Sequence, residues 1–201
     1  MAPGDAEALS EAALASETGF VAAGTEAGVT LVLPPFAVEG ALARYDEVHL
    51  APLIAALEKP RSYAVILLRL GGFSLGFFRG RALIDSKTDQ RFVKGRHRKG
   101  GQSSTRFARI REKQIHELFG KACAAARDKL TPYEAEIEHL FFGGDRRTLQ
   151  GFRKECAYLE RFAGRIAARI LPAPGDPRLQ MLRAMPDEVC SSEVYQVTLA
   201  S

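Results

Sequence analysis

The chain has 201 residues, of which 46% are hydrophobic and 26% are charged, a composition typical of a soluble globular protein with its own core. It contains no run of about 18 apolar residues, so we expect no membrane span. The first twenty residues include acids but neither lysine nor arginine, which argues against a secretion signal and favours a cytoplasmic protein.

Charge is distributed unevenly along the chain, although the formal net charge is only +4. Residues 1–60 carry nine acids and two basic residues, residues 61–130 carry 17 Lys/Arg and five acids, and residues 131–201 are nearly balanced. A strongly basic middle third indicates a polyanionic partner, first of all nucleic acid. A solvated basic surface would have the same composition.

Three cysteines are spread widely, at Cys123, Cys156 and Cys190. Their odd number and separation match neither a disulfide framework nor a zinc site. We therefore expect reduced thiols, mostly in the core, as in other cytosolic proteins.

The N-terminal part of the chain contains three predicted segments. Residues 1–27 are rich in Ala, Glu and Ser without a clear apolar stripe, and we expect them to be weakly ordered. Residues 28–33 (GVTLVL) predict a strand that ends at Pro34-Pro35. Residues 50–57 have the apolar spacing of a helix.

A group of strands follows. Residues 63–70 form an almost continuous apolar run, typical of a strand buried on both faces. Gly71-Gly72 predicts a hairpin turn, and residues 73–78 the returning strand. Residues 81–84 and 91–93 are expected to continue this meander, so that the next loop extends from a sheet edge.

The next loop, residues 94–105, is expected to be mobile and to lead into a long helix that closes at Pro132. Ser103, Ser104 and Thr105 are candidate N-caps. The predicted core stripe of the helix consists of Phe107, Ile110, Ile115, Leu118, Phe119, Ala122 and Ala125.

The C-terminal third alternates short strands and helices. Residues 165–171 fit either type, and their alternation favours a strand. The interleaving predicts a single α/β domain over residues 28–201, with a mixed β-sheet flanked by helices. The predicted elements are a strand at 138–142, a turn at Gly143-Gly144, a helix at 146–156, the strand at 165–171, a helix at 176–185 and a last strand at 194–199.

Gly100-Gly101 followed by Gln102 is the centre of the candidate site. Two glycines let the main chain approach a partner closely. Gln102 offers an uncharged amide, and its backbone N–H can point at a developing anion. The tripeptide alone would also fit a flexible turn, but cations around it attract phosphates. The candidate RNA-binding residues are Lys94, Arg96, His97, Arg98, Lys99, Ser103, Arg106, Arg109 and Lys113.

The run GGQSSTRFARIREK, residues 100–113, resembles the catalytic middle domain of eukaryotic and archaeal peptide-chain release factors. The order of elements over residues 28–199 also follows that domain, and the similarity is sharp only over 100–111. The nearest family is that of the Vms-like release factors, whose bacterial branch has short members. The resemblance implies a release-factor middle-domain fold with an RNase H-like motif and a catalytic loop.

The resemblance further implies a peptidyl-tRNA hydrolase of ribosome-associated quality control. Its loop would enter the peptidyl transferase centre of the large ribosomal subunit, where ribosomal RNA and peptidyl-tRNA are the partners. Gln102 would position water against the peptidyl-tRNA ester, and Gly100 and Gly101 would shape the loop. Nothing in the chain matches a stop-codon-reading domain, so release would be codon-independent. We expect a monomer. We also expect neither a metal nor a cofactor, because no metal ligands lie near the loop.

Other functions remain open at this point. A tRNA acceptor-end endonuclease could use His97 as an acid or base, although a phosphate contact suits this residue better. A non-catalytic rescue adaptor like Pelota shares the fold but has no use for Gln102. A generic RNA-binding module is a fourth reading. Four cations at 146–154, namely Arg146, Arg147, Arg153 and Lys154, are most simply a solvated helix face.

Overall fold

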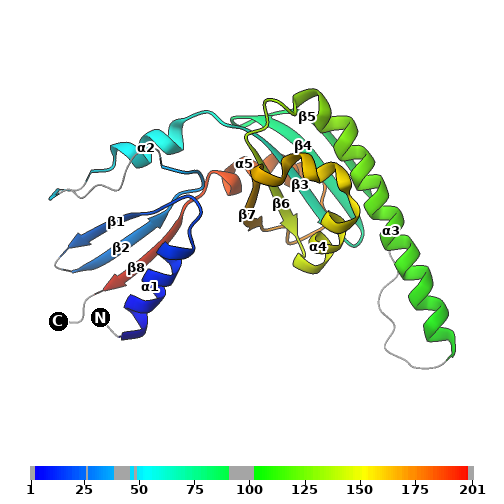
Figure 1. Ribbon diagram of the computed structural model, residues 1–201, viewed down its shortest axis with the longest axis horizontal. Helices are drawn as coiled ribbons and strands as arrows, with labels where there is room; N and C mark the ends of the chain where they lie inside the picture. The colour runs from blue at the N-terminus through cyan, green and yellow to red at the C-terminus, as the bar shows by residue number, and fades with distance from the viewer. Residues whose placement is uncertain (1–2, 26, 39–45, 48, 91–101, 199–201) are drawn as a thin grey trace. The chain divides into compact units, whose positions relative to one another are not determined.

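The computed structural model describes residues 3–25, 27–38, 46–47, 49–90 and 102–198, of which residues 3–6, 8 and 102–105 are described by their backbone only (Figure 1). The chain divides into two compact units. One comprises residues 1–60 with 189–201, and the other comprises residues 61–188. Within the described ranges, no helix has the length and apolarity needed to cross a membrane.

The smaller unit is built on an antiparallel sheet in the order β1-β2-β8. The strands predicted at 28–33 and 194–199 are confirmed as β2 and β8, and the helix predicted at 50–57 is observed as α2. The elements are α1 (Pro3–Ala15), β1 (Val21–Thr25), β2 (Gly28–Leu33), α2 (Ala51–Glu58) and β8 (Glu193–Thr198).

The division of the chain that was predicted at residue 28 falls between two paired strands. Strands β1 and β2 lie on either side of this point and pair from Val21↔Val32 to Thr25↔Gly28. The sequence of β1, VAAGT, consists mostly of small residues and has no clear apolar alternation. Its strand conformation therefore depends on pairing with β2, which a local pattern does not reveal.

The larger unit contains a five-stranded sheet in the order β5-β4-β3-β6-β7. Strands β3, β4 and β5 form an antiparallel meander, whereas β6 runs parallel to β3 and β7 parallel to β6. The predicted α/β fold with a mixed sheet is confirmed. The strands are β3 (Ser62–Arg69), β4 (Gly72–Arg79), β5 (Ala82–Gln90), β6 (His139–Gly144) and β7 (Ile166–Leu171).

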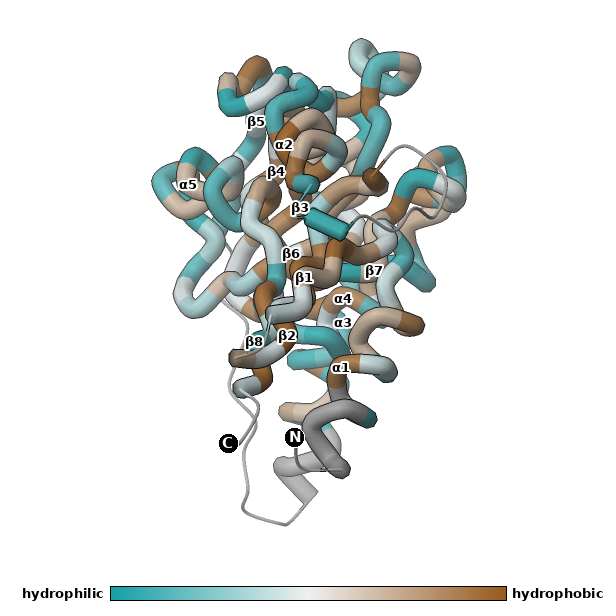
Figure 2. The backbone as a smooth tube through the Cα atoms, turned by 90° about the vertical axis from the view of Figure 1, so that its left-hand side faces the viewer, coloured by the Kyte–Doolittle hydropathy of each residue, from teal (hydrophilic) through white to brown (hydrophobic). Residues whose placement is uncertain are grey.

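Helices cover this sheet. They are α3 (Gln102–Leu130), α4 (Arg146–Glu155) and α5 (Leu179–Val189), with 3-10 segments η1 (Thr131–Tyr133) and η2 (Ala157–Arg165). Ile66 and Leu68 of β3 share one buried cluster with residues of α3, α4 and η2. Figure 2 shows hydrophobic residues along β3 and β6. Each fully buried large apolar side chain contributes about 1.5–3 kcal/mol, so this cluster accounts for much of the stability of the unit.

Several turn predictions are corrected by the strand register. Arg69 pairs with Gly72, so the β3–β4 turn consists of Leu70 and Gly71. Gly143 and Gly144 do not form a turn but complete β6, paired with Leu67 and Leu68 of β3. A Cβ on Gly143 would lie 2.6 Å from Leu67 Cδ2, and one on Gly144 would collide with the Leu68 carbonyl oxygen. Close strand approach explains both glycines.

The meander ends differently from the prediction. Strand β5 is one continuous strand that covers residues 82–90, whereas the predicted strand at 91–93 lies outside the described residues. Because β5 is an edge strand, the expectation that the following segment starts from a sheet edge is confirmed.

The prediction of three reduced cysteines is wrong. Cys123 of α3 and Cys156, the C-cap of α4, form a disulfide, whereas Cys190 is not part of one. The two bonded residues are 33 positions apart and belong to different helices. Their proximity results from the packing of α3 against α4, and spacing in the sequence carries no signal of it.

Candidate RNA-facing site at the start of α3

The C-terminal half of α3 is held firmly against the sheet. Leu118 and Ala122 of the predicted core stripe are completely buried, and so is Leu130. Two cations of this half pair with acids of β5, because Lys129 Nζ lies 3.3 Å from Asp85 and Lys121 Nζ 3.8 Å from Asp89. This half of α3 therefore has a structural role.

Helix α3 is also joined to α4 at one place. The Cys123–Cys156 disulfide lies there, and one residue earlier in α4 the Glu155 carboxylate is 2.8 Å from His116 Nδ1. The hydrogen bond with Glu155, and then its charge, raise the pKa of His116 above its ordinary value. The Phe119 and Phe152 rings pack nearby with centroids 5.8 Å apart. These contacts fix the direction of α3.

Residues 106–113 of α3 are less enclosed. Figure 1 shows that this end of the helix extends past the sheet. Phe107, which was expected in the core stripe, is 37% exposed, and Ile110 is only half-buried. The prediction fails because helical periodicity continues beyond the point where the sheet ends. At 1.5 Å per residue, residues 102–113 span about 18 Å.

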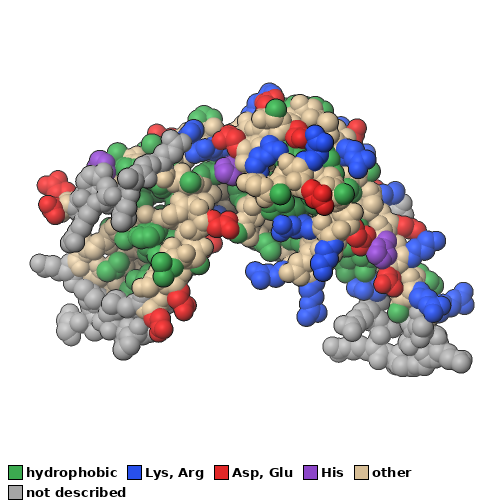
Figure 3. Space-filling model, viewed as in Figure 1, with side chains coloured by type: hydrophobic (Ala, Val, Ile, Leu, Met, Phe, Trp, Pro, Cys, Tyr) green, Lys and Arg blue, Asp and Glu red, His purple; other side chains and the backbone are tan. Residues whose placement is uncertain are grey.

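Cations gather on this end of α3 (Figure 3). Arg106, Arg109 and Lys113 are all exposed, and their spacing of three and four residues puts them on one helix face. Among the described residues, no carboxylate forms an ion pair with any of the three, in contrast to Lys121 and Lys129. The first turn of α3 contains no acid, so nothing in that turn offsets the repulsion between the positive end of the helix dipole and Arg106, the nearest of the three cations. An external anion would relieve this repulsion.

Part of the predicted site lies outside the described residues. This part consists of Lys94, Arg96, His97, Arg98, Lys99, Gly100 and Gly101. Gln102 is the first residue of α3, and Ser103 follows it in the first turn. The helix thus begins one residue before the earliest predicted N-cap. The structure brings Arg106, Arg109 and Lys113 together on the face that starts from Gln102.

Phe107 is a candidate RNA contact that the sequence interpretation missed, because it was assigned to the core. Its exposed ring lies in the sequence between Arg106 and Ala108-Arg109. Aromatic side chains interleaved with cations are typical of surfaces on which RNA bases stack. That interleaving was visible in the sequence and could have suggested this role.

Comparison with known proteins identifies relatives of the chain. The family model of the Actinobacteria/chloroflexi VLRF1 release factor matches residues 61–195, which is more than half of the chain. Peptide chain release factor subunit 1 of Archaeoglobus fulgidus is 35% identical over 104 residues, covering 52% of this chain and 26% of the relative. The protein named subunit 1-2 in Methanosarcina acetivorans is 33% identical over 128 residues, covering 62% and 30%. The chain thus spans about a third or less of the length of these curated relatives.

Solved structures were compared as well. A structure described as the Vms1 mitochondrial localization core aligns with a TM-score of 0.49 and 12% identity, covering 94% of this chain and 79% of that one. The crystal structure of archaeal translation termination factor aRF1 aligns with a TM-score of 0.44 and 19% identity, covering 57% and 31%. Because the family model matches the whole of the larger unit and continues to residue 195, the chain belongs to the Actinobacteria/chloroflexi VLRF1 release factor family.

Proposed function

We propose that this chain is a codon-independent peptidyl-tRNA hydrolase that releases nascent chains from stalled ribosomes at the large subunit. One observation carries the proposal. Gln102 is the first residue of α3, and the same helix continues into an exposed face of three cations without carboxylate partners among the described residues. Membership of a release factor family supports the same class of reaction.

The start of a helix suits Gln102 for catalysis. The first N–H groups of an α-helix have no acceptor within the helix, so the backbone N–H of Gln102 is available to an outside group. The positive end of the helix dipole favours negative charge at this point. A donor placed where charge develops in the transition state accelerates a reaction more than one that binds the ground state equally well.

The proposed reaction is ester hydrolysis. The oxygen of a water molecule bonds to the ester carbonyl carbon, and the bond from that carbon to the ribose oxygen of the terminal adenosine breaks. The ribose oxygen leaves with a proton, and the peptide leaves as a carboxylic acid. Gln102 would orient the water and donate to the oxyanion, so that positioning supplies much of the rate enhancement.

The cationic face of α3 would hold the protein on RNA. Arg106 and Arg109 can donate to phosphate oxygens in a fixed geometry, and Lys113 can contribute a point charge. Contacts of this kind set orientation without reading sequence. They suit a factor that acts at one ribosomal site irrespective of the codon.

The test is Gln102→Ala, assayed on stalled ribosomal complexes with labelled peptidyl-tRNA. The variant keeps the backbone N–H and loses the side-chain amide that orients the water. Loss of this one preorganised group is expected to slow peptide release by about 10²–10³-fold, while cosedimentation with the large subunit is retained. Gln180→Ala, the same chemical change at an exposed position of α5, is the matched control and is expected to release normally. Undiminished release by Gln102→Ala would refute the proposal.

Analysis of the tRNA product separates hydrolysis from cleavage of the tRNA. Intact tRNA with a free peptide is expected from ester hydrolysis. A shortened tRNA, together with a peptide that carries 3′ nucleotides, would instead identify an acceptor-end endonuclease.

A further inference from the structure

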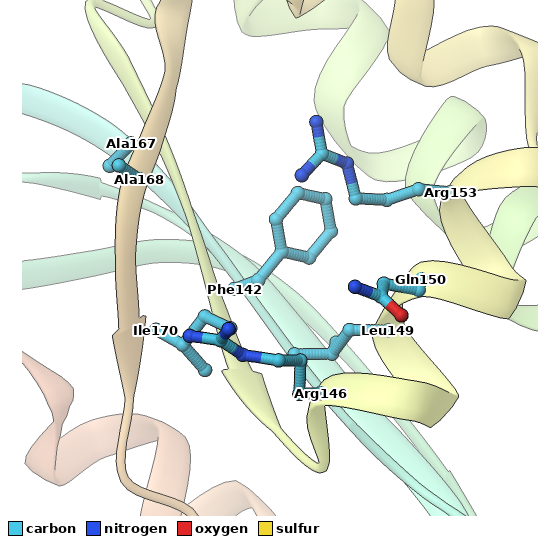
Figure 4. A pocket seen from close by; sticks show the side chains of 8 residues that line it. All are labelled: Phe142, Arg146, Leu149, Gln150, Arg153, Ala167, Ala168 and Ile170. Carbon is cyan, nitrogen blue, oxygen red and sulfur yellow. The ribbon is translucent and has the colours of Figure 1, made fainter.

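A second candidate RNA contact lies on the larger unit, in a pocket of about 250 Å³ between α4 and the edge strand β7. Figure 4 shows its lining, in which Arg146 and Arg153 flank the ring of Phe142. The lining residues are Phe142, Arg146, Leu149, Gln150, Arg153, Ala167, Ala168 and Ile170. The pocket combines an apolar floor with two cations and one amide, and it contains no acid.

The charge of this pocket is uncompensated. Both acids at the ends of α4 have other partners, because Asp145 accepts hydrogen bonds from Thr148 and Glu155 pairs with His116. Within the described part of the chain, Arg146 and Arg153 form no ion pair. An arginine without a carboxylate beside an apolar pocket favours an anionic ligand.

The apolar part of the pocket favours a planar ligand. The Arg153 guanidinium carbon lies 5.6 Å from the centroid of the Phe142 ring, so the cation is held at the pocket by the aromatic face. Ile170 of the edge strand β7 is 37% exposed and adds an accessible apolar side chain to the lining. Stacking on aromatic rings and arginine planes, next to phosphate contacts, is how proteins hold unstacked RNA bases.

We propose that the α4–β7 pocket binds a single-stranded RNA segment, with one unstacked base in the pocket and neighbouring phosphates on Arg146 and Arg153. This inference rests on the proposed function in one respect, because the proposed hydrolase and the proposed pocket both require the chain to bind RNA. Arg146 and Arg153 are seven residues apart, so the helix separates them by about 10 Å along its axis, and they contact different phosphates. Gln150, between them, is the only lining side chain with an amide, which predicts weak base preference.

Helix α4 itself supplies a matched control. Arg147 and Lys154 are exposed and, like Arg146 and Arg153, lie seven residues apart, but they do not line the pocket. The variants Arg146→Ala/Arg153→Ala and Arg147→Ala/Lys154→Ala therefore remove the same charge from the same helix. A difference between them reports the pocket and not general attraction to a polyanion.

The experiment measures binding of a fluorescently labelled single-stranded RNA to the full chain by anisotropy. Arg146→Ala/Arg153→Ala is expected to weaken binding about tenfold or more and to lower the salt slope by about 1.4, for two phosphates on a single strand. The Arg147→Ala/Lys154→Ala variant is expected to change the logarithm of the affinity by less than half as much as Arg146→Ala/Arg153→Ala does. Equal losses in the two variants would overturn the proposal.

Two further measurements test for the base. Ala168→Leu narrows the pocket without changing its charge and is expected to weaken RNA binding. For an RNA with an abasic site, the variant and the parent chain should bind with equal affinity, because no base enters the pocket. Retention of full affinity by Ala168→Leu, with thermal unfolding unchanged, would count against a base in the pocket. A mononucleotide that binds as tightly as the RNA would overturn the assignment to a strand.

The outcome is separable from that of the proposed function. Gln102→Ala is expected to bind the labelled RNA like the parent chain while failing to release peptide. If instead the pocket variants bind RNA normally while Gln102→Ala fails to release peptide, only the pocket assignment is lost.

Discussion

Cys123 and Cys156 join the middle of α3 to the end of α4, with their Cα atoms 5.5 Å apart. The His116–Glu155 pair connects the same two helices beside them. On the N-terminal side of this junction α3 continues toward Gln102, and its residues 106–117 are exposed or half-buried. The junction therefore anchors the helix that begins at the candidate catalytic residue Gln102.

Removal of the disulfide is expected to destabilise the larger unit. The variant Cys123→Ala/Cys156→Ala should lower the free energy of unfolding by about 3–4 kcal/mol, because the unfolded chain regains the entropy of a loop of this length. Urea unfolding followed by circular dichroism measures the change. Cys190→Ala, outside the disulfide, is the control and should cost much less.

Thiol titration checks the bond directly. Denatured protein that has not been reduced should expose one titratable thiol, and reduction should raise the number to all three cysteines of the sequence. Three reactive thiols before reduction would contradict the disulfide.

Gly144→Ala is expected to destabilise the fold. Gly144 has φ 132°, and a Cβ there would collide with the backbone of Leu68 in β3. Backbone strain alone costs about 1–3 kcal/mol, and the collision adds to it. The free energy of unfolding, measured in urea, should fall accordingly.

Gly120→Ala is the matched control for this change. Gly120 lies inside α3, and the position that a Cβ would occupy there is open space, so alanine should raise stability by about 0.4–1 kcal/mol through the unfolded state. A rise in stability for Gly144→Ala, like the one expected for Gly120→Ala, would show that the β3–β6 approach is looser than described.

The cationic face of α3 is expected to govern ribosome affinity. Arg106→Ala/Arg109→Ala should weaken binding to the large subunit and reduce the dependence of log affinity on log salt by about 1.4–1.8, for two lost phosphate contacts. Cosedimentation over a series of salt concentrations measures this slope. Arg127→Ala/Arg183→Ala removes two exposed cations elsewhere, and an equally large change in its slope would disprove a specific role for the α3 face.

The His116–Glu155 pair predicts a pH dependence of stability. Glu155 raises the pKa of His116 in the folded protein, so His116 binds its proton more tightly in the folded than in the unfolded state. This contribution is fully present below the ordinary value of 6.5 and is lost as pH rises through the raised pKa.

The measurement compares the thermal midpoints of the parent chain and His116→Gln across roughly pH 5.5 to 8.5, a range that brackets the ordinary pKa of histidine. The advantage of the parent chain should shrink as pH rises. Because the pair is exposed, the effect should be small and should weaken further with salt. An advantage that grows with pH would have the wrong sign for this pair.

Local sequence patterns were sufficient for the elements that depend on local interactions. The nearly continuous apolar run at 63–70, with its β-branched residues, was sufficient to predict a strand buried on both faces. The α/β order, the start of α3 near Gln102 and its cationic face followed from composition and spacing alone. These features arise from residues close in the sequence, where periodicity and capping preferences act.

The tertiary structure decided what depends on residues far apart. Cys123 meets Cys156 only because α3 packs on α4, and Gly144 serves strand approach instead of a turn only because β6 lies beside β3. Phe107 is exposed because the sheet ends before the apolar stripe does. Arg146 and Arg153, read from the sequence as a solvated face, border a pocket once β7 is placed next to α4. Hydrophobic periodicity predicts which side of a helix is apolar. How much of that side is buried depends on the extent of the surface that packs against it.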